Sequence, residues 1–287
     1  MSPRLDAHVH FFFPGFVGKL PENCRRQSPD EITLYQAHAQ RHEIEQVLAV
    51  GYEGEPWAYG NNGYLASLAA QYPWVRPTAY VADPAQLTVV QLSSWQTQNF
   101  VGISLYIFND EAAQALSQVN DTVWQWLAEH AWLVSVNSSG DLWAAWQPIL
   151  DHHPEVRLLI AHLGLPPAVP TPPEPDVART ALAPVLSLAA FPRVHVKFSG
   201  FYGISQPDYA FPHSAAWPYA QAVTDAYGTM RLVWGSDFSP ALEAVSFPQT
   251  VEVLNAMPWL TAHDRTAIYY DNLARLFTAI EERKAQQ

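Results

Sequence analysis

Short, almost continuously apolar runs recur along the chain at nearly regular spacing. Val47–Val50 and Leu158–Ala161 are representative, and such runs are typical of parallel strands that are covered on both faces. Successive runs lie about 32 residues apart, which is the length of a βαβ unit. The predicted strands are Arg4–His10, Gln46–Gly51, Val75–Val81, Phe100–Ile107, Trp132–Asn137, Val156–His162, Val194–Ser199 and Arg231–Gly235.

The segments between these strands carry apolar residues at three- and four-residue intervals, the period of an amphipathic helix. Ser28-Pro29-Asp30-Glu31 adds a capping signature before the first of them. The predicted helices are Ile32–His42, Asn62–Gln71, Asp110–His130, Leu142–His153, Val177–Ala190, Ala215–Tyr227 and a closing helix, Asp264–Arg283, on the outside. The alternation predicts one domain over residues 1–287, a (β/α)8 TIM barrel of the α/β class, with a doubly wound sheet as the alternative.

The composition narrows the kind of protein. Hydrophobic residues make up 49% of the 287 residues, and the formal net charge of −12 argues against a nucleic-acid partner. The single cysteine, Cys24, excludes an internal disulfide and fits a reducing compartment. The chain shows no signal-peptide pattern, and no apolar stretch reaches the roughly 18 residues of a membrane span. We therefore expect a cytoplasmic protein with no membrane partner, as a monomer or homo-oligomer.

Two histidines lie two positions apart in the first predicted strand, within Asp6-Ala7-His8-Val9-His10. Because strand side chains alternate between faces, His8 and His10 point the same way and can converge on one ion or substrate. Two imidazoles in one pocket indicate a metal or catalytic site. The alternative is a chance pair on a solvated strand.

Further polar residues stand at the ends of later strands, where a barrel of this kind forms its active site. His162 ends the sixth predicted strand and Asp237 follows the eighth, so both should meet His8 and His10 at one mouth. Three imidazoles and a carboxylate are a normal ligand set for Zn²⁺ or Mn²⁺. Asp237 is predicted to bind the metal, to accept a proton from water, or both, and His162 to be a ligand or to polarise a carbonyl. The structural alternatives are a core histidine and a helix N-cap.

Substrate contacts are expected from the loops and strand ends around this mouth. Arg25 suits a carboxylated or polyhydroxylated substrate because a guanidinium binds carboxylate with two hydrogen bonds; the alternative is a solvated arginine. Lys197 is predicted to face the mouth and hold an oxyanion, or else to form an ion pair inside the barrel. Tyr106, Asn137 and Tyr202 complete the predicted substrate contacts.

At these residues the chain resembles the amidohydrolase superfamily, in particular its amidohydrolase-2 (amidohydrolase-related) family. The matching segments follow in order along the whole chain: Asp6–His10, Ile160–Gly164, Val196–Gly200, Val233–Phe238 and Tyr270–Phe277. The resemblance implies a (β/α)8 hydrolase, lactonase or non-oxidative decarboxylase. It also implies His8, His10 and Asp237 as metal ligands and His162 as the group that acts on the substrate.

The fifth strand departs from the metal-binding members of this family, which carry a histidine where this chain has Asn137. The fourth strand, around Val101–Leu105, offers no lysine to bridge a binuclear centre. Asn137 followed by Gly140-Asp141-Leu142 is similar to the sugar-lactone and 2-pyrone-4,6-dicarboxylate lactonase branch, in which some members work without metal.

We therefore expect a lactonase that opens a small sugar-type or carboxylated lactone with activated water, using one divalent ion, Zn or Mn, or none. The alternative enzyme is a metal-dependent non-oxidative decarboxylase of an aromatic or unsaturated acid. A barrel kept only as a binding module is the non-enzymatic alternative.

Overall fold

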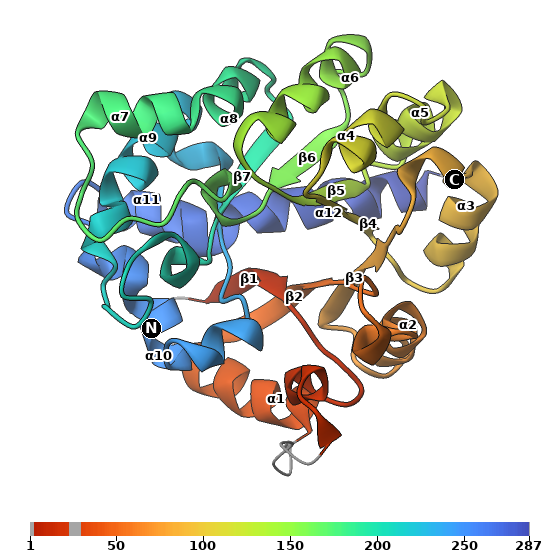
Figure 1. The fold of residues 1–287 in the computed structure, drawn as a ribbon. Helices are drawn as coiled ribbons and strands as arrows, with labels where there is room; N and C mark the ends of the chain where they lie inside the picture. The colour runs from red at the N-terminus through yellow and green to blue at the C-terminus, as the bar shows by residue number, and fades with distance from the viewer. Residues whose placement is uncertain (1–2, 23–29, 287) are drawn as a thin grey trace.

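Eight parallel strands form one sheet in chain order, and the sheet curls into a nearly closed barrel (Figure 1). The computed structural model describes residues 3–22 and 30–286. Its strands are β1 (Arg4–Val9), β2 (Ile44–Val50), β3 (Val75–Tyr80), β4 (Gly102–Ile107), β5 (Leu133–Ser138), β6 (Arg157–Ile160), β7 (Val194–Phe198) and β8 (Leu232–Trp234). The predicted (β/α)8 barrel is confirmed, and the doubly wound alternative is wrong because strand order follows chain order without a reversal.

The barrel closes where β1 meets the segment after β8. Val9 and Phe238 form a parallel bridge, and the Asp237 amide donates to the His8 carbonyl at 2.8 Å. The His10 amide donates to the Phe238 carbonyl. These bonds join the two chain segments that carry His8, His10 and Asp237. The contacts that close the barrel therefore also bring these side chains together.

Helices surround the strands on the outside of the barrel (Figure 1). They are α1 (Glu31–His42), α2 (Asn61–Gln71), α3 (Val89–Thr97), α4 (Asp110–Leu116), α5 (Asp121–Glu129), α6 (Trp146–His152), α7 (Pro175–Ala181), α8 (Ala183–Ser187), α9 (Trp217–Tyr227), α10 (Phe247–Glu252), α11 (Ala262–Thr266) and α12 (Asn272–Ala285). None of the helices within residues 3–22 and 30–286 is both long and apolar enough to cross a membrane.

Several helices differ from their predicted bounds for local reasons. The predicted helix 110–130 is two helices, because the Asn120 side chain accepts the Thr122 amide at 3.0 Å and starts α5 afresh. The predicted helix 177–190 is likewise divided, with Pro184 in the first turn of α8. Helix α3, whose capping box joins Thr88 and Gln91, was not predicted from the sequence.

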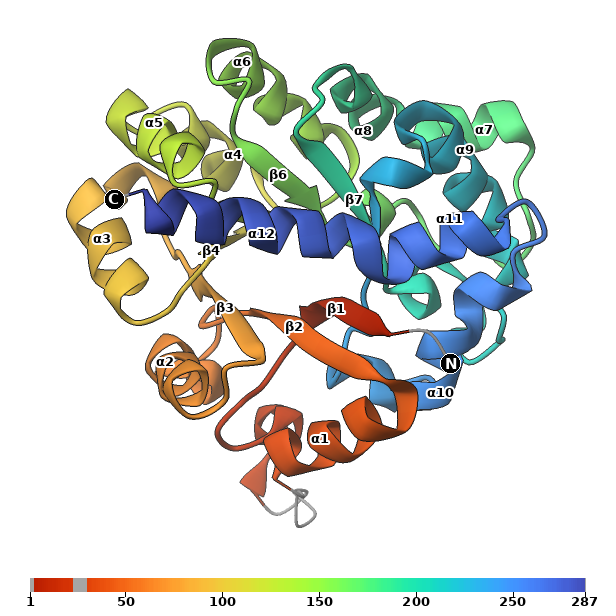
Figure 2. The same ribbon diagram turned by 180° about the vertical axis from the view of Figure 1, so that it is seen from behind.

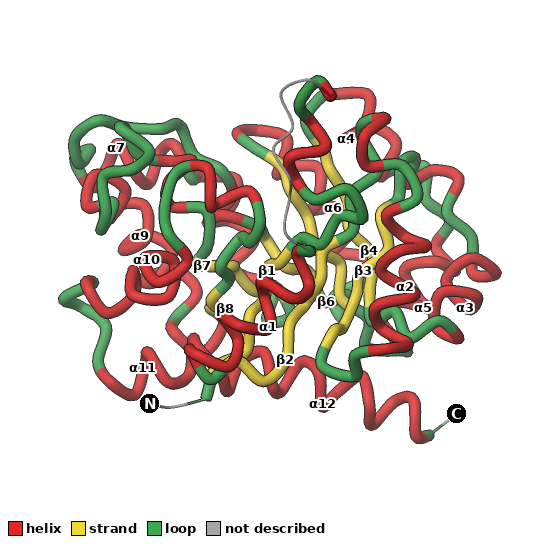
Figure 3. Tube along the Cα trace, turned by 90° about the horizontal axis from the view of Figure 1, so that it is seen from below, coloured by secondary structure: helices red, strands yellow, loops and turns green. Residues whose placement is uncertain are grey.

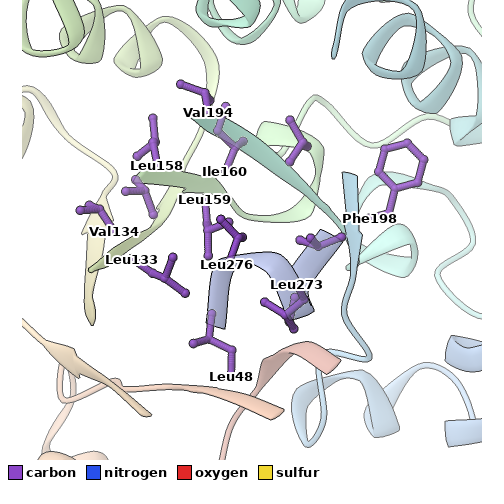
Figure 4. Packing of buried hydrophobic residues seen from close by; sticks show 14 of the residues in the cluster. Leu48, Leu133, Val134, Leu158, Leu159, Ile160, Val194, Phe198, Leu273 and Leu276 are labelled. Carbon is purple, nitrogen blue, oxygen red and sulfur yellow. The ribbon is translucent and has the colours of Figure 1, made fainter. Parts of the chain in front are cut away.

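The closing helix lies across the amino-terminal end of the barrel rather than beside it. Figure 2 shows α12 crossing in front of the strands, and the side view in Figure 3 places it below them. Leu273 and Leu276 on its buried face lie among leucines of the strands, including Leu48, Leu133 and Leu159 (Figure 4). The Asn272 amide group donates to the Leu232 carbonyl at 2.6 Å, which fixes the helix to β8. The amino-terminal end is thus filled with apolar side chains, and the opposite end is left for polar ones.

Candidate active site

Four titratable side chains from three strand ends converge at the carboxyl end of the barrel. His8 lies in β1 and His10 directly after it, His162 follows β6, and Asp237 follows β8. The Asp237 carboxylate oxygens lie 3.6 Å from His8 Nε2, 3.8 Å from His10 Nε2 and 3.9 Å from His162 Nε2. All four residues are buried. The sequence prediction that they meet at one mouth is confirmed.

Asp237 is held in a strained and largely desolvated position. Its φ of 57° lies in the left-handed region, which a non-glycine residue adopts only where its surroundings fix it. The Tyr202 hydroxyl donates to Asp237 Oδ2 at 2.7 Å. Burial raises the pKa of Asp237 to about 6, while His10 and the Tyr202 hydrogen bond oppose this rise. A carboxylate with such a pKa is suited to accept a proton from water near neutral pH.

His162 is placed by the turn that follows β6. Its own φ is 52°, and Leu163, Leu165 and Gly164 also have positive φ values. The ring packs so close to Gly200 that a Cβ there would lie 2.4 Å from His162 Nδ1. Nδ1 lies 3.0 Å from the Ser199 hydroxyl. Burial, reinforced by the charge of Lys197, lowers the pKa of His162 to about 3, so its imidazole is neutral at physiological pH.

The hydrogen bonds of His10 fix where its proton lies. His10 Nδ1 is 2.8 Å from the Val50 carbonyl, which can only accept, so Nδ1 carries the proton and Nε2 is bare. His10 Nε2 lies 3.0 Å from His8 Nε2. A proton on His8 Nε2 makes this contact a hydrogen bond. Without that proton, two nitrogen lone pairs face each other, which is an arrangement that a shared cation stabilises.

Lys197 supports His8 from inside the barrel. Its Nζ lies 3.2 Å from His8 Nδ1 and donates to the Ser135 hydroxyl at 2.7 Å, and its side chain is fully buried. An ammonium group that donates to His8 Nδ1 leaves the His8 proton on Nε2, towards His10. Burial lowers the pKa of Lys197 to about 7, against the attraction of Asp237 and Asp6. The predicted oxyanion contact of Lys197 stays a prediction, since the structure commits Nζ to His8 and Ser135.

Asp6 lies behind His8, and the sequence reading had given it no role. Its carboxylate accepts the amides of His8 at 3.1 Å and Ser236 at 2.9 Å and the Tyr35 hydroxyl at 2.8 Å. It therefore ties the start of β1 to the segment after β8, immediately before Asp237. A carboxylate within a buried apolar strand was the signal that could have identified it. Ser135, a polar residue in the apolar run of β5, carried a similar signal.

The donor set at the mouth fits a divalent cation. The ligand atoms of His8, His162 and Asp237 lie within 4.8 Å of one another, and His10 Nε2 is 3.0 Å from His8 Nε2. Tetrahedral zinc with bonds of about 2.1 Å separates its ligand atoms by roughly 3.4 Å, so modest side-chain movements would complete such a site. The Lys197 ammonium beside His8 opposes a cation there through its charge.

The opposite wall of the mouth is aromatic and includes an unsatisfied hydroxyl. Tyr52 follows β2, Tyr80 ends β3 and Tyr106 lies near the end of β4, and the ring centroids of Tyr52 and Tyr106 lie 4.8 Å apart. Within residues 3–22 and 30–286, the buried Tyr106 hydroxyl finds no partner of hydrogen-bond geometry. Asn137, the cross-strand neighbour of Tyr106, is also buried. The Asn137 side chain is close enough to lower the pKa of the Tyr106 hydroxyl against the effect of burial, but it does not meet hydrogen-bond geometry with it, so this wall can accept a polar ligand that supplies a better partner.

The five predicted substrate residues differ in where the structure places them. Tyr106 and Asn137 lie together on the aromatic wall, and Tyr202 touches Asp237 rather than open space. Lys197 lies beneath His8. Arg25 falls outside the described residues.

Comparison with known proteins gives a consistent set of matches. A family model described as "Amidohydrolase" matches residues 5–278. A curated L-fucono-1,5-lactonase from Burkholderia ambifaria is 36% identical over 89 residues. That aligned stretch spans 30% of this chain and only 27% of the lactonase.

Solved structures match over nearly the whole chain at low identity. A probable 2-pyrone-4,6-dicarboxylic acid hydrolase from Acinetobacter baumannii, solved with citric acid, has a TM-score of 0.72 at 18% identity. The match covers 96% of this chain and 100% of that one. An amidohydrolase from Burkholderia multivorans with bound zinc also gives 0.72, at 19% identity over 96% and 99% of the two chains. At such identities these matches support the fold.

Proposed function

The chain belongs to the amidohydrolase family, and we propose that it is a hydrolase that opens a small sugar-type or carboxylated lactone with activated water. The observation that carries the proposal is the placement of Asp237. This buried carboxylate, with a pKa of about 6, lies within 4 Å of three histidines at the barrel mouth. The lactonase and pyrone hydrolase named among the similar proteins support the choice of substrate class.

In the proposed reaction Asp237 takes a proton from water as the water oxygen adds to the lactone carbonyl carbon. The Tyr202 hydroxyl holds the carboxylate in place throughout. The ring carbon–oxygen bond of the resulting tetrahedral intermediate then breaks. The departing alkoxide takes the proton back from Asp237, which leaves a hydroxy acid and restores the carboxylate.

His162 is proposed to polarise the carbonyl. When the Ser199 hydroxyl donates to Nδ1, the proton of the neutral imidazole lies on Nε2, the nitrogen that faces Asp237. The separation of 3.9 Å between Nε2 and Asp237 Oδ2 is too long for a hydrogen bond, so an oxygen atom lying beside the pair could contact both groups. Nε2–H then stabilises the negative charge that develops on the carbonyl oxygen.

A divalent ion, Zn²⁺ or Mn²⁺, would be held by His8, His10 and Asp237 with His162 beside them. When bound, it would supply Lewis-acid polarisation and a lower pKa for bound water. His10 is prepared for this role, since the Val50 carbonyl keeps its proton on Nδ1. A small-molecule substrate and a cytoplasmic location complete the proposal.

A pH-indicator screen of purified protein against sugar lactones and pyrone carboxylates tests this function, because ring opening releases an acid. We expect turnover of at least one lactone and its loss in Asp237→Asn. Metal analysis, together with His8→Ala, would separate metal-dependent from metal-independent turnover. Carbon dioxide release without acidification would indicate the decarboxylase alternative, and no turnover of any lactone or acid would contradict the hydrolase proposal.

A further inference from the structure

Three arginines line one cavity at the amino-terminal end of the barrel, away from the candidate active site. Arg157 is the first residue of β6, Arg193 immediately precedes β7, and Arg283 lies in the last turn of α12. The cavity has a volume of about 330 Å³. The active-site residues follow the other ends of the same strands. In a chain with 15 basic and 27 acidic residues, three arginines at one cavity are a notable concentration of positive charge.

Arg157 is the central observation. Only 8% of its surface is exposed, yet it forms no hydrogen bond or ion pair with any residue that the structure describes. The carboxylate that acts on it, Glu155, already accepts two hydrogen bonds from Arg193 at 3.0 and 3.1 Å. The like charges of Arg193 and Arg283 also act on Arg157 and oppose its charge. A guanidinium stays protonated even so, and since none of the Arg157 nitrogens is among the buried atoms that lack a hydrogen-bond partner, its donor groups are accessible from the cavity.

The two carboxylates that line the cavity, Glu129 and Glu155, offset only part of the charge of its three arginines. His153 lies 3.1 Å from Asp121, and the one hydrogen bond of the Arg283 guanidinium within the described part of the chain goes to the Gln286 amide oxygen, at 3.4 Å. Glu129 also lines the cavity but is not among the charges that act on Arg157. Gln125 supplies a neutral amide at the same rim. The cavity therefore offers the accessible donor fork of a largely buried arginine, with two further guanidinium groups in its lining.

We propose that this cavity binds a small anion with two or more negative charges, through a phosphate or carboxylate group on Arg157. A guanidinium binds either group with two parallel, charge-assisted hydrogen bonds. The volume lies at the lower end of the range for small-molecule sites, so it suits a metabolite-sized anion. Binding would place a negative charge where the fold has left a positive one unpaired. The site is independent of the proposed hydrolase activity.

Isothermal titration calorimetry of the full chain tests the site, with inorganic phosphate and citrate as separate probes at constant ionic strength. We expect saturable binding of at least one probe, with one site per chain at the amino-terminal end. Separate titrations with phosphate and with citrate show whether the cavity prefers a phosphate group or a carboxylate group. Arg157→Gln should weaken binding by about tenfold or more, as expected for the loss of a bidentate charged contact.

Three further variants make the test specific. Arg283→Gln, at an exposed position, should weaken binding severalfold without affecting folding. Arg179→Gln is the matched control, because Arg179 pairs with Asp225 at 2.7 Å on a different surface. This variant should bind the anion with unchanged affinity. Lys197→Met removes a positive charge beside the active-site mouth and would weaken the binding of an anion there. Anion binding in the arginine-lined cavity should be retained in this variant. The proposal is overturned if neither probe binds saturably, if Arg157→Gln leaves the affinity unchanged, or if Lys197→Met abolishes it.

Discussion

The two ends of the barrel are built from the same strands but filled with opposite chemistry. At the amino-terminal end, Leu273 and Leu276 of α12 lie among leucines of β2, β5 and β6 (Figure 4). At the carboxyl end, burial raises the pKa of Asp237 and lowers the pKa values of His10 and His162. Burial of leucine stabilises the fold, whereas burial of these titratable groups costs stability and prepares them for chemistry. The groups that stabilise the fold and the groups that react thus occupy opposite ends of one sheet.

The strongest test of this division is Asp237→Asn, which removes the proposed base without changing the side-chain volume. We expect kcat/KM for the lactone found in the screen to fall by about a thousandfold, in line with the loss of a general base and its electrostatic role. The melting temperature at pH 8 should not fall. Because the pKa of Asp237 is raised in the folded protein, its protonated form adds to the free energy of unfolding below pH 3.8, and this contribution is lost as the pH rises through about 6. The uncharged amide of Asp237→Asn does not undergo this loss. A large fall in melting temperature would contradict the division.

The opposite result is expected from Leu276→Ala at the other end. Leu276 is buried against the strands, and truncation there should lower the free energy of unfolding by about 3 kcal/mol. Denaturant unfolding measures this change, and kcat/KM under folded conditions should stay the same. Val90→Ala, on the exposed face of α3, is the control and should have almost no effect. If Leu276→Ala lowered the free energy of unfolding no more than Val90→Ala does, α12 would not stabilise this end of the barrel.

Lys197→Met tests how the carboxyl end balances its charges. The ammonium beside His8 opposes a cation and holds the His8 proton towards His10. We expect the variant to bind Zn²⁺ about tenfold more tightly, as measured by competition with a chromophoric chelator. An unchanged or weaker affinity would mean that Lys197 does not act on the metal-binding atoms. Lys19→Met is the control, since Lys19 pairs with Glu243 on an exposed loop.

A smaller effect is expected from Tyr202→Phe, which removes one hydrogen bond to Asp237. That bond lowers the pKa of the carboxyl group, so its loss should raise the pKa above about 6. The acid limb of the kcat/KM profile, where activity is lost as Asp237 becomes protonated, should shift upwards by up to about one pH unit. The pH–rate profile of the two enzymes checks this, and an acid limb that stays in place would argue against Asp237 as the titrating base.

The smallest effect is expected from Tyr106→Phe on the aromatic wall. If the Tyr106 hydroxyl, which lacks a well-formed hydrogen bond, binds the substrate, KM should rise about fivefold, while kcat changes little because a contact made equally in the ground state and the transition state does not alter it. Tyr80→Phe serves as the control on the same wall. A fall in kcat without a change in KM would assign Tyr106 to the reaction instead.

The sequence located the strands well because their apolar runs are buried on both faces, and it located His162 and Asp237 because both follow such runs. It failed for α3, which is short and largely exposed, so packing leaves little periodic signal. It predicted a closing helix outside the barrel but not that this helix covers the amino-terminal end, since an amphipathic pattern identifies a buried face but not its partner.

The barrel, its order of strands and the residue types at its mouth could be predicted from the sequence alone. They follow from local periodicity and from the rule that the carboxyl ends of parallel barrel strands meet at one mouth. Only the tertiary structure decided the protonation pattern. The bonds from Val50 to His10, from Lys197 to His8 and from Tyr202 to Asp237 join residues 40, 189 and 35 positions apart. Desolvation and hydrogen bonding between such distant residues depend on closure of the whole barrel, and no local pattern encodes them.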